Sequence, residues 1–158
     1  MTDLARLLES LAHERVEVIV VGGMAGIAHG AARVTFDLDC VYGRGRENIS
    51  RLAAAMEGFR PTLRGAPADL PFRFDVPTIE AGLNFTLDTL AGPIDFLGEI
   101  VGGGGFDDLL PFTVELEVFG CPCRVVTLGK LIAIKRAAGR PKDLEAIAEL
   151  EALRDERG

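Results

Sequence analysis

The sequence predicts an α/β fold (α+β in stricter usage), and three observations carry this prediction. Amphipathic helical patterns alternate along the chain with short β-branched or alternating runs. The 158 residues are 48% hydrophobic and 26% charged, which is typical of a globular protein with a substantial core. The length suits a single domain over residues 1–158, since no linker or internal repeat divides the chain.

The first third of the chain predicts a helix, a buried strand and a second helix–strand unit. Leucines at positions 4, 7, 8 and 11 recur at helical spacing, so residues 3–14 are expected to form a helix. Residues 16–21 (VEVIVV) are β-branched and predict a buried strand that ends at Gly22-Gly23. We then expect a short helix over 24–29, a strand over 36–42 with Phe36, Leu38 and Cys40 facing the core, and a helix over 47–59.

The remainder predicts a second group of strands followed by two helices. Four prolines make residues 60–81 an irregular excursion with one edge strand, and the glycines of 102–105 predict a mobile loop. The expected elements are strands over 83–90 and 94–97 around a turn at Gly92-Pro93, a hairpin of 114–119 and 124–126, a helix over 128–138 capped by Thr127, and a helix over 142–157.

Charge and cysteine content exclude several classes of protein. The formal net charge is −7, whereas a protein that coats nucleic acid would be basic. No apolar run is long enough to span a membrane, so no membrane partner is expected. Three cysteines, an odd number, argue against a disulfide framework, and the cytoplasm is the expected location.

Two aspartates on one predicted strand point to metal chemistry. Asp37 and Asp39 are two residues apart, so their side chains share one face, about 6–7 Å apart along the strand. They should repel unless a cation lies between them, and carboxylates are the ligands that Mg²⁺ prefers. The alternative is an edge strand with a solvated polar face.

Three further features favour the metal reading. Gly22-Gly23 opens a helix, where backbone N–H groups suit phosphate. Arg33 and Thr35 precede the aspartates and are placed to reach phosphate or metal-bound water. Asp95 stands alone in an apolar strand, and such a charge needs a partner. A metal would join it to the aspartate pair.

The order Gly22-Gly23, Asp37-Leu38-Asp39 and a later Asp95 resembles the signature of the nucleotidyltransferase superfamily of the DNA polymerase beta type. Residues 20–41 and 130–150 are similar to minimal nucleotidyltransferases, especially the group related to abortive-infection toxins. Residues 44–90 match no part of that pattern.

The resemblance implies a palm-like mixed sheet with helices mainly on one face, followed by C-terminal helices. It implies that Gly22 and Gly23 hold a triphosphate, and that Asp37, Asp39 and Asp95 are catalytic and bind two Mg²⁺ ions, with Mn²⁺ as the alternative. Asp95 would help to deprotonate the acceptor hydroxyl. Lys130, Lys142 and Asp143 match positions near the nucleotide. Ala146 departs from the pattern, because that group often has an aspartate there.

The implied function is transfer of a nucleoside monophosphate from an NTP to a hydroxyl of RNA, protein or a small molecule. The chain would then suit a toxin–antitoxin pair with an antitoxin or other partner protein. The alternatives are a non-catalytic nucleotide-binding or partner-binding subunit and a metal-dependent phosphohydrolase.

Other residues have both a functional and a structural interpretation. His29 is either close to the nucleotide or a partly buried ring at a helix end, and Cys121 and Cys123 suit turn packing better than a zinc site. The arginines at positions 44, 46, 51, 60 and 64 form either a solvated face or a rim that contacts RNA or an acidic partner.

Overall fold

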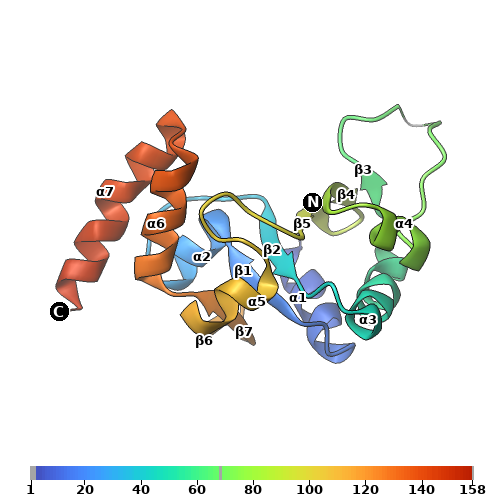
Figure 1. Cartoon of the computed structure of the whole chain (residues 1–158), viewed down its shortest axis with the longest axis horizontal. Coiled ribbons are helices and arrows are strands. Elements are labelled where there is room, and N and C mark those ends of the chain that lie inside the picture. Colours follow the sequence, from blue (N-terminus) through green and yellow to red (C-terminus); the bar gives the residue numbers. More distant parts are fainter. Residues whose placement is uncertain (1–2, 68, 158) are drawn as a thin grey trace.

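A computed structural model of the chain describes residues 3–67 and 69–157 (Figure 1). Its helices are α1 (Leu4–His13), α2 (Gly22–Ala28), α3 (Arg46–Met56), α4 (Val76–Ala81), α5 (Phe106–Leu109), α6 (Leu128–Ala138) and α7 (Pro141–Glu156). Its strands are β1 (Val18–Val21), β2 (Leu38–Tyr42), β3 (Thr62–Leu63), β4 (Asn84–Thr89), β5 (Gly92–Leu97), β6 (Thr113–Val118) and β7 (Cys121–Val126). Short 3-10 turns follow α3 and α5, at Glu57–Phe59 and Leu110–Phe112.

The seven strands form one mixed sheet in the order β3-β4-β5-β2-β1-β7-β6. Strand β2 pairs in parallel with β5, and β1 pairs in parallel with β7, while the other neighbours are antiparallel. The predicted fold class is therefore confirmed, including the mixed sheet. Among the described residues, no helix combines the length and hydrophobicity that a membrane crossing needs.

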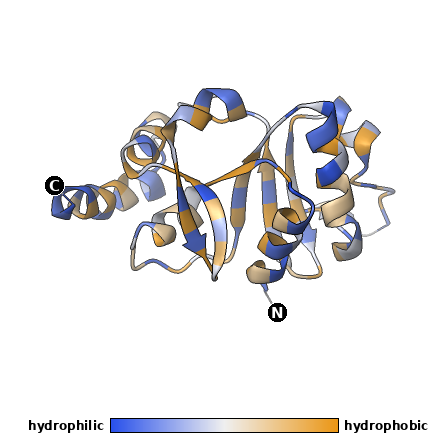
Figure 2. Cartoon of the chain, turned by 90° about the horizontal axis from the view of Figure 1, so that it is seen from below, coloured by the Kyte–Doolittle hydropathy of each residue, from blue (hydrophilic) through white to orange (hydrophobic). Residues whose placement is uncertain are grey.

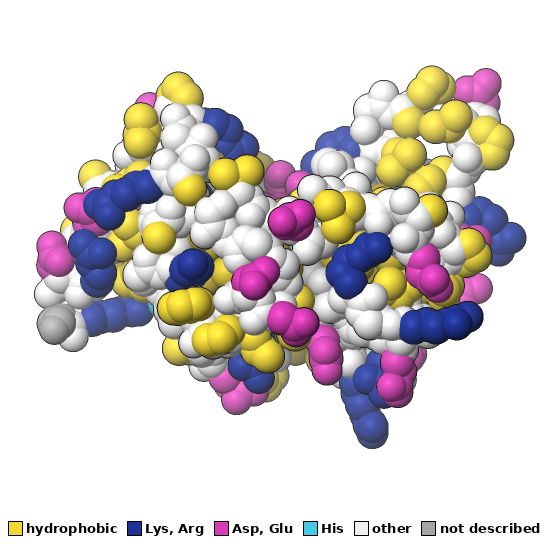
Figure 3. Space-filling view, in the orientation of Figure 1, with side chains coloured by type: hydrophobic (Ala, Val, Ile, Leu, Met, Phe, Trp, Pro, Cys, Tyr) yellow, Lys and Arg dark blue, Asp and Glu magenta, His cyan; other side chains and the backbone are white. Residues whose placement is uncertain are grey.

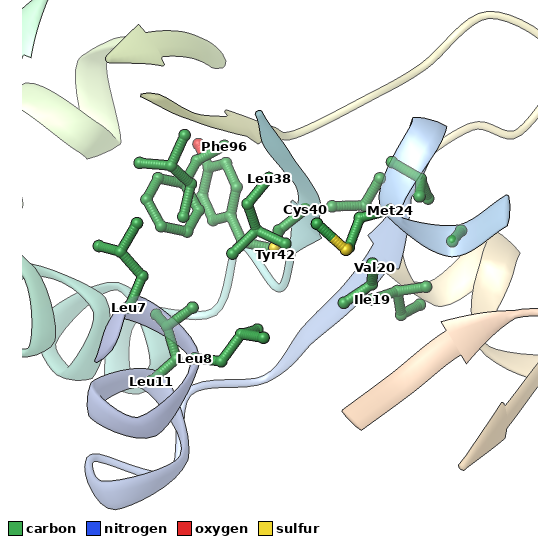
Figure 4. Close-up of a cluster of buried hydrophobic side chains, with 14 of the residues drawn as sticks. Leu7, Leu8, Leu11, Ile19, Val20, Met24, Leu38, Cys40, Tyr42 and Phe96 are labelled. Atoms are coloured by element: carbon green, nitrogen blue, oxygen red, sulfur yellow. The ribbon is translucent and has the colours of Figure 1, made fainter. Parts of the chain in front are cut away.

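Both faces of the central strands are buried, because the successive residues Val41 and Tyr42 of β2 are both fully buried. Tyr42 and Phe96 are fully buried and meet edge-to-face, and Leu7 and Leu11 of α1 lie in the same cluster (Figure 4). Figure 2 shows hydrophobic residues concentrated along the strands of the sheet, with polar residues on the outlying helices. Asp39 lies between the buried Leu38 and Cys40, so its side chain stands on the face opposite to theirs. That face is bordered by α6, and it is where the candidate site lies.

The prediction that Phe36 faces the core is wrong, although Leu38 and Cys40 are buried as expected. Phe36 is 67% exposed. The ladder between β1 and β2 ends at the pair Val21–Asp39, because the chain turns into α2 at Gly22. Residues before Leu38 therefore have no strand beside them on β1 and leave the sheet.

Helix α4 was not expected, because four prolines suggested an irregular segment over 60–81. Asp75 caps this helix, and its carboxylate accepts a hydrogen bond from the Thr78 amide at 3.1 Å. Pro77 lies in the first turn, where its missing N–H costs nothing. The predicted edge strand in this segment is confirmed as β3.

The turns of two hairpins lie elsewhere than predicted. The β4–β5 connection is at Leu90-Ala91, and Gly92-Pro93 already belongs to β5. In the second hairpin Cys121 and Cys123 are part of β7 rather than of the turn. Both cysteines are half-buried thiols, which agrees with a packing role.

Candidate active site

Asp39 and Asp95 are register partners on the neighbouring parallel strands β2 and β5. Adjacent strands lie about 4.8 Å apart, so the two carboxylates are close enough to share one cation. The Oδ1 atoms of both side chains are buried and accept no hydrogen bond. Burial, together with the charges of Asp95 and Asp37, raises the pKa of Asp39 to about 6. One cation lies beside the pair, since Nη2 of Arg64 is 2.9 Å from Oδ1 of Asp95, and two buried carboxylates beside a single arginine suit a further cation.

Asp37 stands apart from this pair. It is exposed and precedes the first residue of β2. Within residues 3–67 and 69–157, no three histidine, cysteine or acidic side chains lie close enough together to form a ready metal cluster. The sequence led us to expect that Asp37, Asp39 and Asp95 converge, but the described structure brings together Asp39 and Asp95, with Asp37 at the rim. The orphaned oxygens of the pair fit a hard divalent cation such as Mg²⁺ or Mn²⁺.

The lack of a side chain at Gly22 leaves space for the Asp39 carboxylate. Its φ is +67°, and a Cβ placed on it would stand 2.3 Å from Oδ2 of Asp39. Gly23 is less constrained, since a Cβ there would be 3.1 Å from Oγ1 of Thr35. The two glycines therefore allow the β1–α2 turn to pass close to the aspartate and threonine side chains.

Two pockets meet at Asp39. The first, which we call the polar pocket, has a volume of about 240 Å³ and is lined by charged or polar side chains that include Arg33, Thr35, Asp37 and Lys142. The second, the apolar pocket, measures about 380 Å³ and is lined by Leu97, Ile100, Val101, Leu131, Ile134 and Ala138. Both pockets share Gly22, Asp39, Lys135, Arg140 and Asp143. Figure 3 shows the molecule hollowed between the α6–α7 side and the β3–β4 side, with acidic side chains at the floor.

A buried carboxylate organises the cations at the junction of the two pockets. Asp143 is 1% exposed and accepts hydrogen bonds from Nε of Arg140 at 2.6 Å and Nη2 of Arg140 at 3.2 Å. These bonds hold the pKa of Asp143 below its usual value. Nζ of Lys135 lies 3.8 Å from Asp143, and burial lowers the pKa of Lys135. Asp143 is therefore a support for cations rather than a group facing a ligand.

The structure brings Lys135, not Lys130, to this junction. Lys130 lies over the ring of Phe112, 4.6 Å from its centroid, and lines neither pocket. Sequence reasoning missed Lys135 and Arg140. One signal was available for Lys135: it shares a helical stripe with Leu131 and Ala138, and a lysine within an apolar stripe needs an explanation.

Arg33 and Thr35 line the polar pocket as the sequence suggested. Nε of Arg33 is 3.1 Å from Oε1 of Glu149, and the amide of Ala32 donates to Oε2 of the same carboxylate at 3.0 Å. Glu149 belongs to α7, so this helix fixes the segment that leads into Asp37. The guanidinium of Arg33 remains half-exposed and faces solvent as well as Glu149.

Of the two interpretations of His29, the structure supports a buried ring at a helix end rather than a position close to the nucleotide. It caps the C-terminal end of α2 and is 4% exposed. Its Nε2 is 2.8 Å from the carbonyl oxygen of Val126, and its Nδ1 is 3.0 Å from Nη1 of Arg157. Burial is the main cause that lowers the pKa of His29. The neutral ring, with Nε2 donating and Nδ1 accepting, satisfies both contacts.

Comparisons with known proteins identify the fold. No protein-family profile matches the chain, and no curated protein matches it in sequence. The chain is similar in structure to TM1012 of Thermotoga maritima, which is assigned as a nucleotidyltransferase, with a TM-score of 0.53, 15% identity and coverage of 96% of this chain and 88% of that one. It is also similar to the antibiotic-resistance factor ANT(2'')-Ia, with a TM-score of 0.56, 16% identity and coverage of 97% and 88%.

The chain thus has a nucleotidyltransferase fold, as the resemblance in its motifs implied. At 15–16% identity these similarities show the fold alone.

Proposed function

We propose that the chain transfers a nucleoside monophosphate from an NTP to an acceptor hydroxyl with the help of a divalent metal ion. The observation that carries this proposal is the pairing of Asp39 with Asp95 in register, with a buried Oδ1 on each that accepts no hydrogen bond. Such a pair gains most from a cation, and its member Asp39 lies where the two pockets meet. Because the fold is that of nucleotidyltransferases, nucleotidyl transfer is the simplest interpretation of this site.

The charges around the site suit a triphosphate. Lys135, Arg140, Lys142 and Arg33 all line the polar pocket, where they would bind phosphate oxygens. The apolar pocket would take an uncharged part of a substrate. Gly22 and Gly23 would let a phosphate approach the backbone of the β1–α2 turn.

In the proposed reaction, a new bond forms between the acceptor oxygen and the α-phosphorus, and the bond to the pyrophosphate oxygen breaks. Asp95 would accept the proton of the acceptor hydroxyl, and Asp39 would orient the reacting phosphate together with the metal. A metal held by Asp39 and Asp95, with Asp37 at the rim, would supply charge stabilisation for the attacking and leaving oxygens. Mg²⁺ is the proposed ion, with Mn²⁺ as a substitute.

One experiment tests this proposal. Purified protein is incubated with each α-labelled NTP and Mg²⁺, and with RNA, protein or small-molecule acceptors from a cell lysate in separate arms. The small-molecule arm includes an aminoglycoside, because one structural neighbour is an antibiotic-resistance factor. We expect label on one acceptor class, and loss of that label in Asp95→Asn but not in Asp155→Asn, an exposed position on α7. Equal labelling by Asp95→Asn would reject the mechanism.

A non-catalytic nucleotide-binding subunit is the second candidate. The absence of a ready three-residue metal cluster among the described residues favours it. It would bind an NTP in the same pockets and transfer no label to any acceptor. In that case a partner protein, such as the antitoxin of a toxin–antitoxin pair, would be the target of the nucleotide-bound form. Co-purification of a partner with nucleotide, without transfer, would support this reading over catalysis.

A further inference from the structure

Arg64 lies in the same row of the sheet as the two central carboxylates. It follows β3, and its amide donates to the carbonyl oxygen of Thr86 at 2.9 Å, which extends the β3–β4 ladder by one step. Thr86 is the register partner of Asp95, and Asp95 is the register partner of Asp39. Figure 1 shows β3 at the far edge of this group of strands. Side chains in one row stand on one face, so Arg64 can reach over Thr86 to the site.

The guanidinium of Arg64 is held mainly by β4. Its Nη2 donates to the carbonyl oxygen of Leu87 at 2.7 Å, and its Nε donates to Oδ1 of Asp88 at 3.2 Å. Nη2 also lies 2.9 Å from Oδ1 of Asp95. That last contact is an ion pair without hydrogen-bond geometry, because the same Asp95 oxygen has no hydrogen-bond partner. The charge of Arg64 therefore lies beside Asp95, while Oδ1 of Asp95 accepts no hydrogen bond.

The charges of these groups add up to the charge that one divalent cation neutralises. Asp37, Asp39, Asp88 and Asp95 contribute four negative charges, and Arg64 contributes one positive charge. Arg140 and Lys135 carry two positive charges beside the single buried carboxylate of Asp143, so this group adds one positive charge and the total is −2.

We propose that Arg64 is a resident counter-ion of the carboxylate site, which supplies in the nucleotide-free protein the positive charge that a second metal ion would bring. This inference rests on the proposed metal-dependent function. The nucleotide-free protein then binds one divalent cation, and further positive charge enters only together with the negatively charged triphosphate. Arg64 weakens binding of the metal alone and so makes metal binding depend on the nucleotide.

The test is the affinity of the nucleotide-free protein for Mn²⁺, followed by electron paramagnetic resonance. Removing a positive charge a few ångströms from the site in Arg64→Gln should tighten Mn²⁺ binding roughly tenfold. Arg64→Lys keeps the charge and should stay near the wild-type affinity. Arg73→Gln is the matched control, because Arg73 is an exposed arginine of the same segment that lines a different pocket beside α3. It should bind Mn²⁺ as the wild type does.

A second variant tests the inference even if the Arg64→Gln protein does not fold. Asp88→Asn removes the exposed carboxylate that shares Arg64, so the guanidinium should pair more strongly with Asp95. Mn²⁺ binding should then weaken. Unchanged or tighter binding in Asp88→Asn, or unchanged or weaker binding in a folded Arg64→Gln protein, overturns the inference.

The outcomes separate this inference from the proposed function. If the wild-type protein labels an acceptor and binds Mn²⁺, and Arg64→Gln binds Mn²⁺ with the same affinity, only the role of Arg64 is overturned. If the wild-type protein labels no acceptor and binds no Mn²⁺ at millimolar concentrations, with or without NTP, both the role of Arg64 and the proposed function are overturned.

Discussion

Gly22 lies so close to Asp39 that a Cβ on the glycine would stand 2.3 Å from Oδ2 of the aspartate. The glycine is thus part of the carboxylate's environment, and its positive φ of +67° lets the chain turn from β1 into α2 at this point. The double glycine and the aspartate are separated in sequence, but they form one structural unit. Four predictions follow from this unit and its surroundings.

Gly22→Ala should displace Asp39 and weaken Mn²⁺ binding. The variant must accommodate both the left-handed backbone and the clash with the carboxylate. Gly120→Ala is the matched control, since Gly120 has a φ of +75° and open space around it. Each variant should lose about 1–2 kcal/mol of folding free energy from the backbone alone. In urea unfolding, Gly22→Ala should lose more stability than Gly120→Ala. In Mn²⁺ titration, only Gly22→Ala should lose affinity. Equal affinities in the two variants would contradict the role of Gly22.

Asp39→Asn should stabilise the metal-free protein at pH 8. The folded pKa of Asp39, about 6, is above the usual aspartate value of 3.8, so the folded state binds the proton more tightly than the unfolded state. The favourable contribution is fully present below pH 3.8 and is lost as the pH rises through 6. At pH 8 the carboxylate therefore costs about 1–3 kcal/mol, after allowance for its partial exposure.

Urea unfolding of wild type and Asp39→Asn at pH 8 and at pH 4 measures this difference. The stability gap should be large at pH 8 and small at pH 4. Asp155→Asn, at an exposed site, should show no such gap. A gap that grows on acidification would mean that Asp39 is stabilised in its charged form, contrary to its buried, unpartnered oxygen.

His29→Gln should remove part of the acid sensitivity of the fold. The pKa of His29 is lowered by burial, so the unfolded state takes up a proton more readily than the folded state. The stabilising contribution of the neutral ring is fully present above pH 6.5 and is lost as the pH falls below that value.

Thermal or urea unfolding between pH 5 and pH 8 checks this prediction. Wild type should lose stability toward pH 5, and His29→Gln should lose less, although it should be about 1–3 kcal/mol less stable at pH 8 because the contacts to Val126 and Arg157 are disturbed. His13→Gln is the control, since the His13 side chain is 85% exposed. Parallel curves for wild type and His29→Gln would refute the assignment.

Lys135→Met should weaken nucleotide binding more than Lys130→Met does. Lys135 lines both pockets at Asp39, while Lys130 lies over Phe112. Loss of one charge-assisted contact to phosphate corresponds to roughly tenfold or more in affinity. Equilibrium binding of a fluorescent NTP to the two variants decides between the lysine that the sequence resemblance favours and the one that the structure favours. A larger effect of Lys130→Met would restore the sequence-based assignment.

The sequence was sufficient for features that depend on local pattern. Spacing of Leu4, Leu7, Leu8 and Leu11 predicted α1, and Thr127 predicted the start of α6, where its hydroxyl accepts from the Lys130 amide. Helix α4 was not predicted, because the number of prolines in this segment was considered without their positions. Pro77 lies in the first turn, and the cap residue Asp75 was the available signal.

The candidate site was predicted in part. Gly22, Asp39 and Asp95 lie together, as the motif spacing suggested, because β1, β2 and β5 are adjacent in the sheet. Asp37 is at the rim because it precedes the β1–β2 ladder.

Sequence by itself determined the alternation of helices and strands, the glycine turn and the candidate aspartates Asp37, Asp39 and Asp95. These follow from periodicity and residue type, which act over a few neighbouring positions. Only the tertiary structure decided which cations face them. Lys135, Arg140 and Arg64 reach Asp39 or Asp95 through strand register and helix packing, which join residues far apart in the chain. Coulomb interactions depend on distance in space, so the charge balance of the site is a property of the folded chain.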